Sequence, residues 1–174
     1  SEIIFIPVQT PHDERFEGIT RLPRARADFN YKHLINATYD TIHAIEKYGE
    51  PRIVCIISTV LPGTIKTRIE PVVRRANQLH KVVKMVYTPQ FIAMGTTIQD
   101  FLNPEFTLLG VDDPDAAETM DKFFTEMTGK PTFKTDIATA EGIKVFYNTF
   151  ITMKTVLGNI YGEMAEKLGM NVDD

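Results

Sequence analysis

Apolar residues follow two different spacings along the chain, and these spacings predict a succession of strands and helices. Short continuous apolar runs are typical of buried strands, whereas apolar residues that recur every three or four positions indicate amphipathic helices. Strands are predicted at residues 3–8, 53–57, 82–87, 107–111 and 131–134, and helices at residues 31–47, 65–79, 114–127 and about 135–168. Strands that alternate with helices over residues 3–87 predict an α/β fold with a parallel sheet and right-handed crossovers.

The last predicted helix, residues 135–168, combines a polar stripe with otherwise apolar faces. Lys144 and Asn148 lie one helical turn apart on one face, which continues with Glu141, Thr152, Thr155 and Asn159. A surface helix normally shows the reverse, a single apolar stripe on a polar rod. Spacing alone leaves two interpretations open: the stripe is the solvated side of the helix, or it presents an amine and a carboxamide that have a function.

The length of this helix predicts a partner. Roughly 30 residues extend about 45 Å at about 1.5 Å per residue, which is longer than the typical helix of a globular protein. We therefore expect it to pack against something outside the small sheet, most simply a second copy, giving a homodimer through residues 136–168. The predicted domains are residues 1–135, an α/β unit, and residues 136–174, the start of a helical dimerisation domain.

Composition and charge exclude several classes of protein. The chain is 43% hydrophobic and 24% charged, as expected of a globular protein, and its net charge of −4 indicates neither nucleic-acid nor anionic-membrane binding. No apolar run approaches the ~20 residues that span a bilayer. The one cysteine, Cys55, lies in a predicted strand; we interpret it as a buried hydrophobe and expect a reducing cytoplasm. The four histidines show no ligand spacing, so we expect no metal site.

Polar residues follow three of the predicted strands at the points where the strands end. They are Thr10-Pro11, Ser58-Thr59 and Thr88-Pro89-Gln90. Ligands of open α/β sheets bind outside the carboxyl ends of the strands, where hydroxyl groups can bond a cofactor and proline restricts the turn. Each pair alone is a weak signal, because such residues are common at strand ends.

Four blocks of sequence, taken in order, carry a resemblance. They read I-I-F-I-P-V-Q-T-P (residues 3–11), S-T-V-L-P-G-T (58–64), T-P-Q-F-I-A-M-G-T (88–96) and A-E-G-I-K-V-F-Y-N-T-F (140–150), the last followed by an apolar helix and E-K-L-G-M-N-V-D-D. Together they resemble the UDP-glucose/GDP-mannose dehydrogenase family, and the blocks cover nearly the whole chain. The resemblance implies the second half of a Rossmann-like NAD-binding domain, followed by the long helix of a dimerisation domain.

The resemblance also implies roles for particular residues. Catalytic positions of the family fall on Lys144, Asn148 and Gln90, and NAD contacts fall on Thr10, Pro11, Ser58 and Thr59. A substrate-binding segment falls on Phe91, Ile92, Ala93 and Met94, together with Lys144 and Asn148. The family oxidises a nucleotide-sugar primary alcohol to a carboxylate with two NAD and a cysteine nucleophile. The expected substrate is a UDP-sugar, with UDP-glucose oxidised to UDP-glucuronate.

The sequence departs from the family pattern at several points. Gln90 and Met94 stand where the family has glutamates, and glutamine can hold a water molecule but cannot take its proton. No G-x-G-x-x-G is present, and the family's cysteine lies beyond the long helix. We therefore expect an internal part of such a dehydrogenase that is inactive by itself. The alternatives are a non-catalytic dimerisation or binding remnant and a β-hydroxyacid dehydrogenase relative. Asn103-Pro104-Glu105-Phe106 spells the family's substrate motif but follows G-T-x-I-x-D-F-L, so we assign Glu105 a structural role before a strand.

Overall fold

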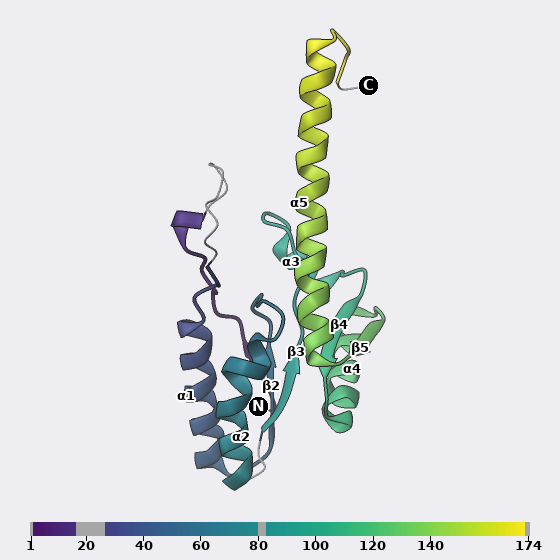
Figure 1. Ribbon diagram of the computed structural model, residues 1–174. Coiled ribbons are helices and arrows are strands. Elements are labelled where there is room, and N and C mark those ends of the chain that lie inside the picture. Colours follow the sequence, from purple (N-terminus) through teal and green to yellow (C-terminus); the bar gives the residue numbers. More distant parts are fainter. Residues whose placement is uncertain (1, 17–26, 80–82, 173–174) are drawn as a thin grey trace.

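A computed structural model describes residues 2–16, 27–79 and 83–172 of the protein and shows a five-stranded sheet with helices on both faces (Figure 1). The strands lie side by side in chain order: β1 (Ile3–Ile6), β2 (Arg52–Ile56), β3 (Val83–Tyr87), β4 (Thr107–Val111) and β5 (Thr132–Thr135). The helices are α1 (Lys32–Tyr48), α2 (Glu70–Leu79), α3 (Thr97–Leu102), α4 (Pro114–Thr128) and α5 (Ile137–Lys167), with a 3-10 turn η1 (Glu14–Phe16) and a π-helical turn η2 (Ile65–Ile69). The α/β fold and the long last helix are confirmed, and the domain boundary at residue 135 stays a prediction.

The sheet is parallel except at its centre. β1 pairs with β2, β2 with β3, and β4 with β5 in parallel, as the alternation of strands and helices predicts. β3 and β4, however, run antiparallel, with Val86 opposite Val111 and Tyr87 opposite Gly110. The chain between these two strands contains only the short helix α3 and no long crossover helix. A strand that follows such a connection runs back along its neighbour, since a parallel neighbour needs a crossover to the other end of the sheet.

Alternate residues of the central strands enter two separate cores. Val54 and Ile56 pack with residues of α1 and α2 on one face of the sheet, and Ala140 at the start of α5 joins this cluster. Ile53 and Cys55 point to the opposite face, where they pack with residues of α4. Cys55 is fully buried and free, which confirms its interpretation as a core residue. Both faces of β2 are covered, which explains why its sequence is continuously apolar instead of alternating.

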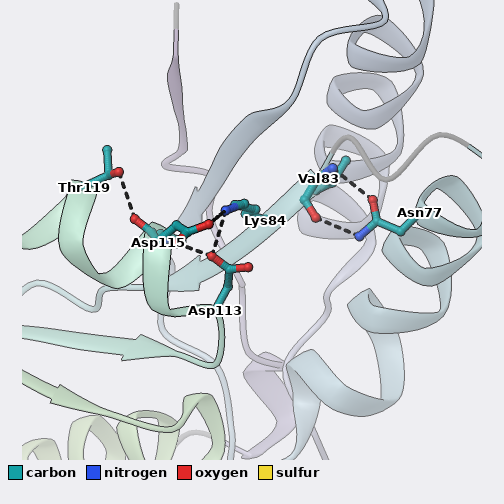
Figure 2. Close-up of polar contacts among 7 residues, drawn as sticks. Asn77, Val83, Lys84, Asp113, Asp115 and Thr119 are labelled. Carbon is teal, nitrogen blue, oxygen red and sulfur yellow. Dashed lines mark hydrogen bonds and ion pairs between the residues drawn. The ribbon is translucent and has the colours of Figure 1, made fainter.

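Polar contacts attach β3 to the helices on either side of it, as Figure 2 shows. The Lys84 ammonium lies 3.0 Å from a carboxylate oxygen of Asp113 and 2.8 Å from one of Asp115, at the start of α4. The Asn77 carboxamide of α2 bonds both backbone groups of Val83, at 2.7 Å and 2.9 Å, as a neighbouring strand would. These contacts stabilise the position of β3 between α2 and α4.

Helix α5 begins against the sheet and then extends well beyond it (Figure 1). Asp136 caps its first turn by accepting a hydrogen bond of 2.8 Å from the Thr139 N–H. Its first turns pack on β4 at Gly110, where a Cβ atom would lie 2.6 Å from the Ala140 Cβ. In the described part of the chain, no helix has the length and apolar character needed to cross a membrane.

Candidate active site at the carboxyl ends of β1 to β3

The polar stripe of α5 is buried at its beginning and exposed further along. Glu141 is fully buried and Lys144 is 6% exposed, whereas Asn148, Thr152, Thr155 and Asn159 are exposed. A solvated stripe therefore describes only the later residues. The buried part of the stripe faces the ends of β2 and β3, because the Glu141 carboxylate bonds the loop after β2 and Lys144 bonds the segment after β3.

The side chain of Lys144 is buried, and its ammonium group makes two contacts. Its Nζ donates a hydrogen bond of 2.8 Å to the backbone oxygen of Gln90 and lies 4.9 Å from the centre of the Phe91 ring. Burial lowers the pKa of Lys144 from its usual value. An ammonium has three N–H groups, and the hydrogen bond to Gln90 uses one of them. Its contacts with the described residues therefore leave N–H groups that can donate to a ligand.

A cavity of about 610 Å³ opens beside this lysine. Of the residues expected at the substrate, the cavity is lined by Phe91, Ile92, Ala93, Lys144 and Asn148. Gln90 and Met94 are not among its lining residues: the Gln90 side-chain amide donates to the Thr88 backbone oxygen at 3.0 Å, and the Met94 side chain is fully exposed. The cavity thus joins the segment after β3 to the face of α5 that carries Lys144 and Asn148.

Several residues of this cavity were not anticipated from the sequence: Asp100, Asn103, Pro104, Glu105, Phe106, Tyr147, Ile151 and Thr152. Asp100 accepts hydrogen bonds from the Ala93 N–H at 2.9 Å and the Thr96 hydroxyl at 2.7 Å, which hold the turn before α3 and lower the pKa of its carboxyl group. Glu105, assigned above to the turn before a strand, also lines the cavity. The spacing of Lys144 and Tyr147 on one helix face was the available signal for Tyr147.

A second cavity of about 330 Å³ also adjoins helix α5. It is lined by Phe29, Thr59, Leu61, Val145, Asn148, Thr149, Thr152 and Met153. Asn148 and Thr152 line both cavities. The carboxamide of Asn148 therefore stands where a ligand at the end of β2 would meet a ligand beside Lys144.

Two of the hydroxyl groups at the strand ends, those of Thr10 and Ser58, join the end of β1 to the end of β2. The Thr10 hydroxyl donates to the Thr59 backbone oxygen at 2.7 Å, and the Ser58 hydroxyl donates to the Val8 backbone oxygen at 2.5 Å. The Pro11 backbone oxygen accepts from the Asn30 N–H at 2.8 Å. Thr59 is the one residue of this group that lines a cavity, and its hydroxyl has no hydrogen-bond partner among residues 2–16, 27–79 and 83–172.

The described residues contain no group of three histidine, cysteine or acidic side chains that could hold a metal ion. The side chains that line the two cavities supply the amine of Lys144, the carboxamide of Asn148, carboxylates and hydroxyl groups.

Comparison with known proteins identifies the family. Residues 1–128 match the UDP-glucose/GDP-mannose dehydrogenase family, NAD binding domain. The UDP-glucose 6-dehydrogenase of Rickettsia conorii is 27% identical over 100% of this chain, and the UDP-N-acetyl-D-mannosamine dehydrogenase of Methanocaldococcus jannaschii is 25% identical over 96% of it. The chain spans 36% and 38% of the lengths of these two relatives.

The fold is shared with solved structures of similar proteins. The GDP-mannose dehydrogenase from Pseudomonas aeruginosa, solved as a ternary complex, superposes with a TM-score of 0.86 at 23% identity. The superposition covers 99% of this chain and 37% of that protein. The family match over residues 1–128 covers three of the four sequence blocks, and the alignment with the Rickettsia conorii relative also covers the fourth, so the resemblance is confirmed. The match makes NAD the cofactor of this domain. The chain therefore belongs to the UDP-glucose/GDP-mannose dehydrogenase family.

Proposed function

We propose that the chain is part of an NAD-dependent dehydrogenase that oxidises the C6 alcohol of a UDP-sugar, with UDP-glucose converted to UDP-glucuronate. The observation that carries this proposal is the meeting of two cavities at Asn148, one beside Thr59 and one beside Lys144. Hydride transfer needs cofactor and substrate in adjoining sites, with the reacting atoms about 3–3.5 Å apart. The relatives are named for different nucleotide sugars, so the choice of UDP-glucose as the substrate is itself a proposal.

The cavity beside Thr59 fits the nicotinamide end of NAD. Phe29 and Leu61 give it apolar walls for a flat ring, and the Thr59 hydroxyl and the Asn148 carboxamide offer polar groups to a ring amide. Thr10, Pro11 and Ser58 contribute by fastening the ends of β1 and β2 beside it. When bound, NAD supplies the acceptor for the hydride that leaves the alcohol carbon.

Lys144 and Asn148 stabilise the oxygen of the substrate. An alcohol that loses hydride must also lose its proton, so negative charge develops on its oxygen. The Lys144 ammonium is fixed by the Gln90 backbone oxygen and directs its remaining N–H groups to the cavity, where the low dielectric strengthens their effect. The Asn148 carboxamide, one turn further along α5, donates to the same oxygen from the junction of the cavities.

Residues 91–94 and Gln90 complete the proposed substrate site. Phe91, Ile92 and Ala93 form one wall of the larger cavity, and Met94 lies on the exposed turn that follows. Gln90 keeps its side-chain oxygen as an acceptor for a water molecule, since its amide nitrogen is committed to the Thr88 backbone oxygen. It can orient that water but cannot remove its proton.

We further propose a homodimer through residues 136–168 and a cytoplasmic location. Beyond Lys144 helix α5 exposes large apolar side chains along its length, including Phe150, Leu157 and Ile160. Such a surface is the kind that a second copy covers. The buried free thiol of Cys55 is compatible with a reducing compartment.

The experiment is NADH formation by the full-length protein with UDP-glucose, UDP-N-acetylmannosamine and GDP-mannose, each alone. We expect the largest kcat/KM with UDP-glucose. Lys144→Met should lower kcat by about 10²–10³-fold, the usual effect of removing one oxyanion donor. The control is Lys47→Met, exposed on α1 and outside both cavities. Absence of NADH with all three sugars, or full activity of Lys144→Met, contradicts the proposal.

A further inference from the structure

The loop between β2 and α2 has its backbone N–H groups bonded by two side chains that come from distant parts of the chain. The loop runs from Ile57 to Thr64 and leads into η2, which begins at Ile65, and then α2. The N–H groups of Gly63 and Ile65 donate to the Glu141 carboxylate of α5, at 2.6 Å and 2.8 Å. The Leu61 N–H donates to the Tyr31 hydroxyl at 3.2 Å, and the Thr64 N–H donates within the loop to the Leu61 oxygen at 3.1 Å. The N–H groups of residues 61, 63, 64 and 65 are thus all bonded inside the protein.

Glu141 occupies the place that a bound anion takes at the start of many helices. Free N–H groups and the helix dipole make such a start favourable for negative charge. Here a carboxylate of the protein takes that position, in a side chain with no exposed surface. Burial raises the pKa of Glu141, while the two N–H groups act in the opposite direction. The helix start is therefore closed to a phosphate group and serves as an attachment point for α5.

Tyr31 holds the same loop from the opposite side. Its hydroxyl accepts from the Leu61 N–H and from the Thr64 hydroxyl, both at 3.2 Å, and donates to the Asp28 carboxylate at 2.7 Å. The ring is 6% exposed and lies at the start of α1. The loop is thus held between the segment before α1 and the beginning of α5.

This attachment adjoins the smaller of the two cavities of the proposed active site. Thr59 and Leu61, at the beginning of the loop, line the smaller cavity. On α5, Lys144 follows Glu141 by about 4.5 Å of helix rise and Asn148 by about 10 Å, at about 1.5 Å per residue. A change in the distance between Glu141 and the loop therefore moves the amine and the carboxamide relative to Thr59.

We propose that Glu141 is a positioning residue that fixes the Lys144 and Asn148 face of α5 against the loop after β2, so that the two cavities stay in register for hydride transfer. Tyr31 is the second positioning residue of the same loop. The expected effect of Glu141 on the reaction rate rests on the proposed function. Its effect on the loop does not, because the hydrogen bonds are a property of the chain itself.

Conservative substitutions separate this role from a general loss of folding. Glu141→Gln keeps the shape but replaces one acceptor oxygen with an NH₂ group, so one buried N–H loses its partner. Glu141→Asp keeps the charge but is one methylene shorter, so it holds the loop only if α5 moves toward it. Tyr31→Phe removes a single hydroxyl and leaves the buried ring in place. Glu118→Gln, exposed on α4 and outside both cavities, is the matched control.

The test combines hydrogen exchange with kinetics on the full-length protein. In Glu141→Gln we expect the amides of Gly63 and Ile65 to exchange about tenfold faster, because a charged hydrogen bond is lost. With UDP-glucose and NAD as probes, kcat should fall by about 10–100-fold, since a displacement on the order of 1 Å can cost that much. The dissociation constants of NADH and UDP-glucose, each measured alone, should change by less than about threefold, because each ligand stays in its own cavity. Glu141→Asp should recover part of the rate, Tyr31→Phe should accelerate exchange at Leu61, and Glu118→Gln should change nothing.

Two results overturn the inference. The first is unchanged exchange at residues 61–65 in both Glu141→Gln and Tyr31→Phe. The second is faster exchange with an unchanged kcat, or faster exchange in which the affinities for NADH and UDP-glucose fall by as much as kcat. If Glu141→Gln does not fold, Tyr31→Phe decides by the same measurements. If the unmodified protein oxidises no nucleotide sugar, the proposed function fails, and the exchange of residues 61–65 and 144–148 alone decides whether Glu141 attaches α5 to the loop.

Discussion

The contact between Gly110 of β4 and the first turns of α5 gives the sharpest prediction about stability. In Gly110→Ala the added Cβ would lie 2.6 Å from the Ala140 Cβ, 3.1 Å from the Ile137 Cα and 3.3 Å from the Tyr87 backbone oxygen. Two carbon atoms normally approach no closer than about 3.5 Å. Neither alanine has a rotamer that could relieve the contact, so α5 must move away from the sheet by about 1 Å. Overpacking of this kind costs about 1–3 kcal/mol.

Gly142, on the same helix, supplies a matched control of opposite sign. A Cβ at this position would meet only the Phe146 ring, at an ordinary 3.7 Å. Because glycine in a helix interior is less stable than alanine by roughly 0.5–1 kcal/mol, Gly142→Ala should stabilise the chain by about that amount. The free energies of unfolding of the two variants should therefore differ by about 1.5–4 kcal/mol, from the two ranges just given.

Equilibrium unfolding in urea, followed by far-ultraviolet circular dichroism at one protein concentration, measures both changes. With a slope near 2 kcal/mol per molar urea, Gly110→Ala should lower the midpoint by about 0.5–1.5 M. In the double variant Gly110→Ala/Ala140→Gly the closest contact is removed, so the two changes should be less than additive. A midpoint of Gly110→Ala at or above that of the unmodified chain would refute the reasoning. Strict additivity in the double variant would show that Ala140 is not the cause.

Three further predictions concern Lys144, Cys55 and the exposed half of α5. Burial lowers the pKa of Lys144 below its usual 10.5. Between the pKa of the folded chain and that of the unfolded chain, the folded chain binds fewer protons, so its stability rises with pH. Lys144→Met lacks this contribution, so any stability advantage of the variant should shrink as the pH rises toward 10.5 in urea titrations, and a constant difference would contradict the assignment. Burial raises the pKa of the Cys55 thiol, so a thiol reagent should label it only after unfolding; rapid labelling of the folded chain would contradict its place in the core. Light scattering should show a dimer at micromolar concentration that Phe150→Asp/Leu157→Asp converts to monomer, and a monomeric unmodified chain would contradict the proposed interface.

The strands and the larger helices could be predicted from local pattern because each buries a recognisable face. The strand at residues 107–111 and the helices at residues 32–48, 114–128 and 137–167 agree with their predicted ranges to within one or two residues at each end. Helix α3 was missed because T-I-Q-D-F-L is short, and its residues are exposed or only half-buried, so no periodic apolar face marks it. The predicted helix at residues 65–79 begins instead with the π-helical turn η2, whose bonding the apolar spacing does not reveal.

The candidate site could be predicted only as far as single segments carry it. The spacing of Lys144 and Asn148 and the polar residues at the strand ends pointed to segments that the structure brings together around two cavities. Spacing could not show that Glu141 and Lys144 are buried, since a polar stripe on a helix is also the pattern of a solvated face. Nor could it reveal Phe29, Tyr31 or Glu105 at the site, because each reaches it through contacts between segments far apart in the sequence.

The sequence by itself determined the α/β class, the family, the long final helix and the segments that hold the candidate chemistry. These follow from periodicity, from residue types at strand ends and from four ordered blocks, all of which are local in the chain. Only the tertiary structure decided how the segments meet. The antiparallel pairing of β3 and β4 reverses the direction of the last two strands, so α5 starts at the opposite end of the sheet and runs toward the carboxyl ends of β2 and β3, where it bonds the segments that follow these strands. That arrangement buries Glu141, brings Lys144 to Gln90 and joins two cavities at Asn148. No local pattern encodes it, because it depends on contacts between residues that are far apart in the sequence.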